Sequence, residues 1–450
     1  MSNLDLPNSA KDSNTVHQDK RISRRKALQL GGALTSAALA APAFLSACGG
    51  TGSLVSDSSS SSSTKTLRVY WNPGHAYKSY QQVIDKFEQD HAGWKVKLEQ
   101  YQWPDMRTKV LANFAAGDVP DLIEEPGGWV QEFGIAGKLR SLQQYVDKDG
   151  KSIGFPDDWQ EYTVQRNTVN GEVYGVQLHL TCSLLFYNKE MLQKSGKSVP
   201  TTWEELLATC QALTSNGVYG CALNQDASYS WSWYLQNGVR EYDPAKKVIA
   251  MDNDAAYQAL QFQSDLIHKY KVAPAPVATG SYDGPQKLLS ARKAAFILTG
   301  PWDIKPIVTA DANFPLGIAQ ALKHKTQATY AAGTSLMIPK DAKNPDLAWE
   351  LLKRLVALDV EVAATKEAGM TMPRKSWGQH PETQKLPMIA PFAQGLQYAQ
   401  FAGGELEKTG KSGAVTDLYN KAYQDVIYKQ VPASQALKDF VATGNKQLSS

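Results

Sequence analysis

The hydrophobic pattern changes its period twice between Leu67 and Leu98, which constrains the fold more than any other feature of the chain. Residues 67–71 alternate along a strand, residues 80–87 place apolar side chains on one helical face, and residues 94–98 alternate again. Two strands joined through a helix run parallel in one sheet. The segment therefore predicts a βαβ unit.

Further along the chain, short signals predict more helices and turns. Thr202 and Glu205 match a capping box, and Asn344-Pro345 is typical of a helix start. Asn170-Gly171 predicts a hairpin turn between two short apolar runs. Alternating helices and strands without an internal repeat favour the α/β class.

Length and composition bound the class of protein. The 450 residues, even without a leader, exceed the roughly 250–300 residues that one core usually supports, so we expect two lobes. The hydrophobic fraction of 42% and the charged fraction of 20% are those of a globular protein. The net charge is +3, with no basic block beyond residues 24–26, so nothing indicates a nucleic-acid partner.

The first 47 residues have the features of an export signal. Arg24, Arg25 and Lys26 precede an apolar run that ends in Leu45-Ser46-Ala47-Cys48. This ending resembles the lipobox of bacterial lipoproteins, which implies cleavage before Cys48 and acylation of its sulfur. We therefore expect residues 1–47 to be a signal peptide and the mature protein to be extracytoplasmic, lipid-anchored to the outer face of the cell membrane or periplasmic.

The export route and the fate of the apolar run have alternatives. The paired arginines resemble a twin-arginine signal, but Ala27 stands where that signal has a bulky apolar residue, so the general secretory route stays open. Residues 27–47 are also long enough to span a membrane. Polar residues and many alanines make this run a weak spanner, which favours the signal peptide.

After Cys48, residues 49–64 are rich in glycine and serine, so we expect residues 48–64 to be a lipidated cysteine and flexible tether. With Cys48 acylated, three cysteines remain. A Cys210–Cys221 disulfide and three free buried thiols are both compatible with this sequence.

Several segments in the same order resemble the extracellular solute-binding proteins of sugar ABC importers, the family that includes maltose-binding protein. They are residues 115–122 (AAGDVPDL), 174–176 (YGV), 186–189 (FYNK), 200–206 (PTTWEEL), 300–302 (GPW), 342–349 (AKNPDLAW) and 369–374 (GMTMPR). The resemblance implies a two-lobed periplasmic-binding-protein-like α/β fold, each lobe a mainly parallel sheet flanked by helices, with hinge strands between the lobes. It places lobe 1 at residues 65–177 plus 328–365 and lobe 2 at residues 178–327 plus 366–450.

The same resemblance implies a function. A protein of this family captures a sugar or oligosaccharide by lobe closure and delivers it to the transmembrane subunits of an ABC permease. We also expect a monomer that is not an enzyme and has no cofactor or metal.

Ligands of open α/β sheets bind beyond the carboxyl ends of strands, so residues after the predicted strands are the candidates for the sugar site. Flat aromatic rings cover the apolar faces of a pyranose, and carboxylates or amides bind its hydroxyls. By resemblance, the tryptophan of the Gly-Pro-Trp segment packs on the sugar, which makes Trp302 the foremost candidate. The predicted substrate-binding residues are Trp71, Asn72, Glu125, Trp129, His179, Asp226, Tyr229, Trp231, Trp302, Asp303 and Arg374.

Two other functions and one structural role compete with this interpretation. A secreted glycoside hydrolase needs the same aromatic rings and a pair of carboxyl groups, but no recognised catalytic motif is present. A ligand sensor or adhesin without a transport role is the third class. Each candidate could also be structural: Arg374, for example, could pair with a carboxylate across the hinge.

Overall fold

The computed structural model describes residues 64–277, 284–401 and 404–450, which belong to one compact unit, Ser62–Ser450. The predicted signal peptide, Cys48 and nearly all of the tether lie outside the described residues. Within the described ranges, no helix combines the length and apolarity needed to cross a membrane.

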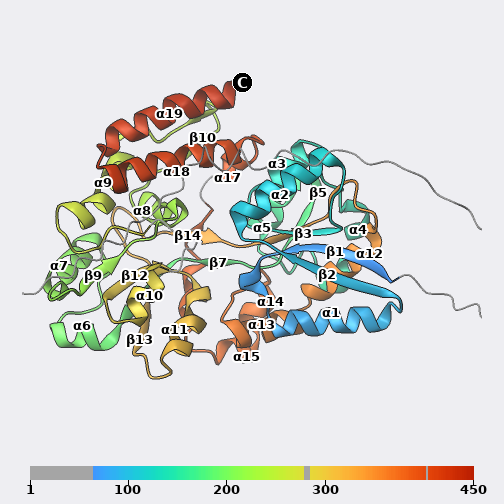
Figure 1. The fold of residues 1–450 in the computed structure, drawn as a ribbon, viewed down its shortest axis with the longest axis horizontal. Coiled ribbons are helices and arrows are strands. Elements are labelled where there is room, and N and C mark those ends of the chain that lie inside the picture. The colour runs from blue at the N-terminus through green and yellow to red at the C-terminus, as the bar shows by residue number, and fades with distance from the viewer. Residues whose placement is uncertain (1–63, 278–283, 402–403) are drawn as a thin grey trace, which may run out of the picture. The chain divides into compact units, whose positions relative to one another are not determined.

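The first sheet has five strands within the described chain, in the order β2-β1-β3-β15-β6. Strands β1, β2 and β3 of this sheet are labelled in Figure 1. They are β1 (Lys65–Trp71), β2 (Trp94–Gln100), β3 (Leu122–Glu125), β6 (Gly175–Gln177) and β15 (Ser335–Met337). Strands β1 and β2 pair in parallel along their whole length, from Lys65 opposite Trp94 to Trp71 opposite Gln100. The predicted βαβ unit is confirmed.

Helix α1 (Lys78–Asp90) connects β1 to β2 and buries the face formed by Tyr80, Ile84 and Phe87. It packs against α12 (Pro345–Leu355) and α13 (Leu358–Ala368), which come from a distant part of the sequence. Helices α2 (Trp103–Ala116) and α3 (Trp129–Ile135) follow β2 and β3. The carboxyl ends of β1 and β3 thus lead directly into Asn72 and Pro126.

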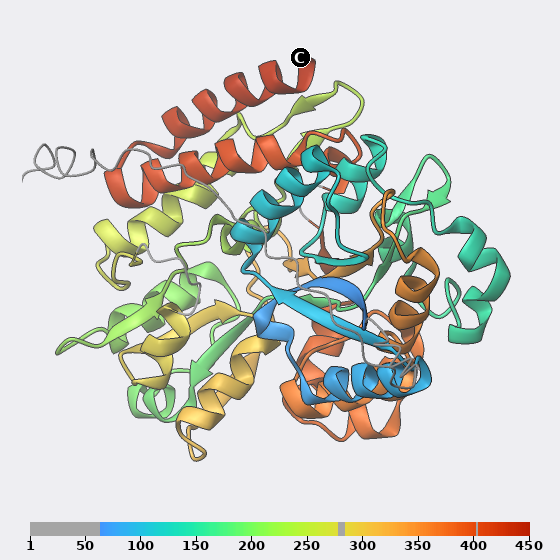
Figure 2. The same cartoon turned by 45° about the vertical axis from the view of Figure 1, so that its right-hand side comes forward.

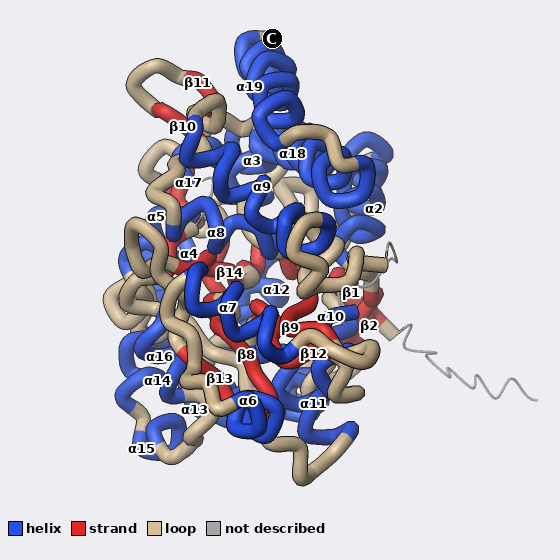
Figure 3. Tube along the Cα trace, turned by 90° about the vertical axis from the view of Figure 1, so that its left-hand side faces the viewer, coloured by secondary structure: helices blue, strands red, loops and turns tan. Residues whose placement is uncertain are grey.

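The second sheet has four strands in the described chain, in the order β13-β8-β12-β9. They are β8 (Leu184–Asn188), β9 (Tyr219–Ala222), β12 (Ala294–Thr299) and β13 (Leu316–Ala319). Figure 3 shows these strands together with α6 (Lys189–Ser195), α7 (Trp203–Leu213) and α10 (Gly284–Ser290), which contact them. The expected helix start at Thr202 is confirmed, because its side chain accepts from the Glu205 amide.

A third, three-stranded sheet has the order β16-β14-β7, with β7 (Thr181–Cys182), β14 (Thr329–Ala332) and β16 (Ala399–Gln400). Strand β7 follows β6 of the first sheet and precedes β8 of the second, and β14 precedes β15. Next to β14 lies α8 (Trp231–Gln236), which packs on α9 (Asp254–His268). Figure 2 shows the long helices α18 (Ser412–Lys429) and α19 (Ala433–Ser449) side by side, and both contact α9.

The remaining elements are short. The hairpin predicted at Asn170-Gly171 is confirmed, because β4 and β5 pair across it. The strands are β4 (Thr168–Val169), β5 (Glu172–Val173), β10 (Tyr242–Asp243) and β11 (Val248–Ile249). The helices are α4 (Gln143–Asp149), α5 (Glu161–Arg166), α11 (Ile304–Ala310), α14 (Lys375–Gln379), α15 (Pro381–Gln384), α16 (Ala390–Gly395) and α17 (Gly404–Glu407), with 3-10 helices η1 (Pro73–His75), η2 (Gly150–Ile153), η3 (Ala227–Ser230) and η4 (Pro301–Asp303).

The expectation of mainly parallel sheets is wrong. In the first sheet, β1 pairs in parallel with β2 and β3, but β15 runs antiparallel to both β3 and β6. In the second sheet only β12 and β9 are parallel, and β8 is antiparallel to β12 and β13. The physical reason is the connection: strands joined through a helix crossover run parallel, whereas strands that enter from another sheet are free to run the opposite way.

Two further expectations concern the limits of the lobes and the pairing of the cysteines. The lobe limits stay a prediction, although the limit at residues 365 and 366 falls inside helix α13. Cys182, Cys210 and Cys221, which are the cysteines of the described chain, are free and buried. The Cys210–Cys221 disulfide is therefore not formed in this structure.

Candidate functional site

A cavity of about 370 Å³ brings together side chains that lie after strands of the first sheet and side chains from the second half of the chain. His75, Trp103 and Trp129 come from η1, α2 and α3, whereas Tyr229, Trp231 and Trp302 come from η3, α8 and η4. The cavity is therefore built from segments that are far apart in the sequence, and it combines aromatic rings with charged groups.

Six of the predicted site residues line this cavity. Trp129 and Trp302 were predicted because they follow strands, and His179 because it lies at the expected crossing between the lobes. Asp226, Tyr229 and Trp231 were predicted because they lie together in one aromatic-rich polar loop. The structure brings these six together. Their role in ligand binding stays a prediction.

The aromatic rings differ in how they are held. The rings of Tyr229 and Trp302 meet edge to face with centroids 6.3 Å apart. The indole N–H of Trp302 has no hydrogen-bond partner among the described residues. Trp231 is buried against Tyr419, with ring centroids 4.8 Å apart. Trp302 therefore combines a place in the cavity wall with a free donor, and Trp231 is held mainly by its own packing.

Trp71, Asn72 and Glu125 do not line the cavity but hold residues that do. The indole N–H of Trp71 donates to the carbonyl oxygen of His75 at 2.9 Å, with the ring only 2% exposed. The side-chain oxygen of Asn72 accepts from the Gly74 amide at 2.8 Å, which begins η1. These two contacts place His75 at the cavity. The prediction that Trp71 and Asn72 touch the ligand finds no support in this geometry.

Glu125 lies beneath the segment that leads into α3. One of its carboxylate oxygens accepts from the amides of Gly127 and Trp129, at 2.7 and 3.1 Å. Burial raises the pKa of Glu125 to about 7, although the charge of Arg166 and the two amide hydrogen bonds oppose this shift. Glu125 thus positions Trp129, and its own side chain is buried.

Asp303 and Arg374 lie outside the cavity wall. Asp303 is buried and accepts a hydrogen bond from the Thr299 hydroxyl at 2.6 Å. Arg374 donates to Asp158 at 2.8 Å and lies over the ring of Trp159. The pairing of Arg374 with a carboxylate is the structural role considered from the sequence, so its assignment to the ligand site is not supported by its position.

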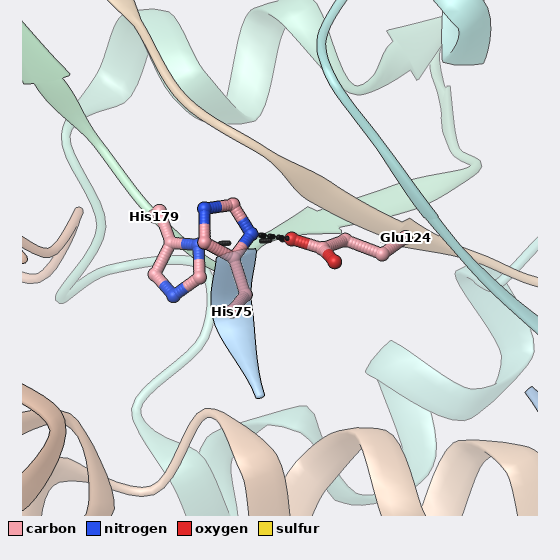
Figure 4. Close-up of side chains that lie close together, drawn as sticks. All are labelled: His75, Glu124 and His179. Carbon is pink, nitrogen blue, oxygen red and sulfur yellow. Dashed lines mark hydrogen bonds and ion pairs between the residues drawn. The ribbon is translucent and has the colours of Figure 1, made fainter. Parts of the chain in front are cut away.

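Two histidines and one buried glutamate form a compact cluster at the cavity (Figure 4). The Nδ1 atom of His75 lies 2.5 Å from Glu124, whose other carboxylate oxygen accepts from the Asn72 amide at 2.9 Å. His179 lies between the hydroxyls of Tyr80 and Thr334, at 2.8 and 2.9 Å. Burial lowers the pKa of His179 well below its usual range, and the neighbouring His75 lowers it further.

Two imidazoles and a carboxylate are ligands that transition metals accept, and the ligand atoms of this cluster lie within 4.8 Å of one another. The cluster is nevertheless closed by its own hydrogen bonds, since each of the three side chains already has a protein partner. We therefore treat His75, Glu124 and His179 as a polar support for the cavity.

Two arginines line the cavity, and each is held by a glutamate through two hydrogen bonds. Arg107 donates to Glu132 at 2.9 Å in both bonds, and Arg166 donates to Glu407 at 2.9 and 2.8 Å. The second pair is almost fully buried, with each side chain 9% exposed, and it joins α5 to α17. Paired in this way, the guanidinium groups add little net charge to the site.

A third buried acid, Glu241, has no such partner. It precedes β10, lines the cavity and is only 8% exposed. No described residue forms a hydrogen bond or ion pair with its carboxyl group. Burial, helped by the nearby charge of Glu407, raises the pKa of Glu241 to about 8.

Sequence reasoning missed Arg107, Arg166, Glu241 and Glu407. None of them follows a predicted strand, and charged residues in helices or loops are usually solvated. Trp103, which was not among the predicted site residues, also lines the cavity. Only the tertiary structure brings these residues to one place.

Comparison with known proteins gives a consistent result. Residues 71–357 match the family described as bacterial extracellular solute-binding protein. The chain is 24% identical over 425 residues to a maltooligosaccharide ABC transporter solute-binding lipoprotein of Streptococcus pneumoniae serotype 4, covering 85% of this chain and 95% of the relative. It is 25% identical to the galactooligosaccharide-binding protein of Bacillus subtilis, covering 68% of this chain and 72% of the relative.

Solved structures agree on the fold. The GacH receptor of Streptomyces glaucescens, solved unliganded and with acarbose, has a TM-score of 0.77 at 21% identity, covering 86% of this chain and 99% of the receptor. The maltotriose-binding protein of Thermus thermophilus has a TM-score of 0.72 at 23% identity, with 85% and 99% covered. The predicted two-lobed α/β fold is confirmed, and the chain belongs to the bacterial extracellular solute-binding protein family.

Proposed function

We propose that this protein captures a sugar or oligosaccharide outside the cytoplasm and delivers it to the transmembrane subunits of an ABC permease. The observation that carries the proposal is the cavity in which Trp129, Tyr229 and Trp302 lie beside carboxyl groups. Aromatic rings cover the apolar C–H faces of a pyranose, and buried carboxylates pair with its hydroxyls. The names of the relatives in Streptococcus and Bacillus support a carbohydrate as the ligand.

The capture mechanism follows from a site with walls on different parts of the chain. A ligand that touches both walls binds the closed arrangement more tightly than the open one, and it therefore shifts the population toward closure. We propose the limits predicted from the sequence for the two lobes, and the acylated Cys48 as the membrane anchor. The protein acts as a monomer and without catalysis.

A thermal-shift screen with maltooligosaccharides, galactooligosaccharides and their monosaccharides tests the proposal, because binding to the native state raises stability. At least one saccharide is expected to raise the melting temperature in proportion to the logarithm of its concentration. A screen in which no saccharide does so contradicts the proposal. Small-angle scattering with the hit is expected to show a smaller radius of gyration.

The competing hydrolase is tested in the same samples. The carboxyl groups of the cavity resemble the acid pair of a glycosidase in kind, so the saccharide should be recovered after prolonged incubation. Intact saccharide is expected. New reducing ends that form in proportion to the protein concentration would show that the protein is an enzyme and would contradict a function in binding alone.

A further inference from the structure

The charge of the cavity is unbalanced. Five carboxyl side chains line it, against two guanidinium groups, and both guanidinium groups are already paired with Glu132 and Glu407. Asp226, Glu241 and Asp417 are left without an ion-pair partner among the described residues. The wall that faces a ligand therefore carries a surplus of acid.

Glu241 gives this surplus a definite place. Asp226 and Asp417 are exposed, so water solvates them, but Glu241 is 8% exposed and forms no hydrogen bond or ion pair with a described residue. Buried carboxyl groups in native proteins are nearly always paired, because leaving one unpaired is costly. A buried acid that lines a binding cavity and has no protein partner is suited to a partner that arrives with the ligand.

The chemistry of Glu241 discriminates between ligand groups. A sugar hydroxyl offers one neutral hydrogen bond, whereas a protonated primary amine offers three donors and a positive charge. Hydrogen bonds between charged groups are roughly twice as strong as neutral ones. An ammonium group also offsets the like charge of Glu407, which opposes ionisation of Glu241, whereas a hydroxyl does not. A phosphorylated or acidic sugar meets the same carboxyl groups with the wrong sign.

We infer that the cavity takes an amino sugar, as a monosaccharide or within an oligosaccharide, and that Glu241 is the counter-ion of its protonated amine. The inference rests on the proposed function, since it names the class of carbohydrate that the same cavity binds. The aromatic rings of Tyr229 and Trp302 cover the sugar ring, and Glu241 selects the substituent.

Binding is then coupled to a proton. Free Glu241 holds its proton at neutral pH, because burial raises its pKa to about 8. An ammonium group placed beside it favours the carboxylate, so the proton leaves when the ligand binds. The titratable groups that interact electrostatically with Glu241 are Glu407, Tyr330 and Tyr419, and the two tyrosines stay protonated at neutral pH because burial raises their pKa values.

Calorimetry with matched ligands tests the inference. The probes are glucosamine, N-acetylglucosamine and glucose, each as the monosaccharide and as its β-1,4 oligomers, with putrescine as an amine that has no sugar ring. The free amine is expected to bind at least about tenfold more tightly than its acetylated and hydroxyl counterparts. Titration in two buffers of different ionisation enthalpy is expected to show close to one proton released per amine bound and none for the neutral sugars.

Variants assign the effect to one residue. Glu241→Gln keeps the size of the side chain and removes its charge, so it is expected to abolish both the preference for the amine and the release of the proton. Glu405→Gln is the matched control, because Glu405 is an exposed acid of the same helix as Glu407 that does not line the cavity. This control is expected to retain both properties.

The outcomes separate this inference from the proposed function. Equal affinity for the three sugar series, a preference that survives Glu241→Gln, or putrescine binding as tightly as glucosamine would each overturn the amino-sugar assignment. If neutral oligosaccharides bind and amino sugars bind no more tightly, the amino-sugar assignment is overturned, but carbohydrate capture is still supported. If no sugar of either kind binds, carbohydrate capture itself is contradicted.

Discussion

Glu124 and Glu241 are both buried carboxyl groups close to the same cavity, yet their surroundings are opposite. Glu124 is fully buried, accepts from the Asn72 amide and lies 2.5 Å from His75. Glu241 has no partner among the described residues and has Glu407 as a nearby like charge. Burial alone therefore does not distinguish a structural acid from one that is available to a ligand. The two kinds of acid differ in whether protein donors contact the carboxyl group.

Glu407 is a buried carboxyl group that would lack a partner, as Glu241 does, if Arg166 were absent. Replacing Arg166 by Met should leave the carboxyl group of Glu407 buried and without its partner. The expected loss of folding stability is about 3–5 kcal/mol, the usual cost of removing one partner of a buried pair. Urea unfolding measures it.

The double variant Arg166→Met with Glu407→Leu is the control. Because it also removes the stranded acid, it should recover most of the stability lost in the single variant. A double variant no more stable than Arg166→Met would contradict the view that Arg166 serves mainly to neutralise Glu407.

The second prediction concerns Glu124 itself. Glu124→Leu leaves the Asn72 amide and His75 without an acceptor in a buried place, so the expected loss is about 2–4 kcal/mol. Glu241→Gln is the matched variant on the other side of the comparison, and at neutral pH it should not lower stability. Urea unfolding measures both variants. Equal losses of stability would contradict the view that Glu124 stabilises the fold through its protein partners and that Glu241 does not.

The third prediction asks whether the ligand uses the wall near Trp302. Trp302→Ala should weaken saccharide binding by about 1–3 kcal/mol, the scale of a lost aromatic contact. Trp94→Ala is the control, because Trp94 is a half-buried tryptophan of β2 that does not line the cavity. Calorimetry that finds unchanged affinity in a folded Trp302→Ala protein would remove Trp302 from the site.

Local patterns explain which parts of this molecule could be predicted from the sequence. The unit from β1 to β2 depends on residues that are near one another in the chain, so its hydrophobic period is visible. Trp129 and Trp302 could be predicted because strand ends meet at one edge of a sheet. The direction of β15 could not, because it depends on the sheet from which the chain returns.

The charged groups of the cavity show the limit of such patterns. Arg166 and Glu407 are far apart in the sequence, and each follows no strand, so nothing local indicates that they form a buried pair. The sequence also does not predict that Glu241 lacks a partner, because this depends on which residues surround it in the folded protein. The aromatic half of the site was therefore predictable, and the electrostatic half was not.

A further expected effect is a pH dependence of stability that depends on Glu241. Folding raises the pKa of Glu241 from 4.5 to about 8, so the folded protein holds one more proton than the unfolded chain between these values. Stability should therefore fall as pH rises through this window, by up to about 1.4 kcal/mol per pH unit, and the penalty should be absent below it. Glu125, whose pKa is raised to about 7, and Glu361, raised by burial, add slopes of the same sign.

The difference between the parent protein and Glu241→Gln isolates one of these slopes, because Glu125 and Glu361 are unchanged in both. Urea unfolding from about pH 5 to about pH 8 should show two curves that diverge with rising pH, with the glutamine variant the more stable at the alkaline end. Curves that stay parallel would mean that Glu241 ionises as readily in the fold as in water. A saturating amino sugar should reduce the difference in stability between the parent protein and Glu241→Gln at the alkaline end. Its ammonium group would pair with the carboxylate of Glu241, which has no protein partner.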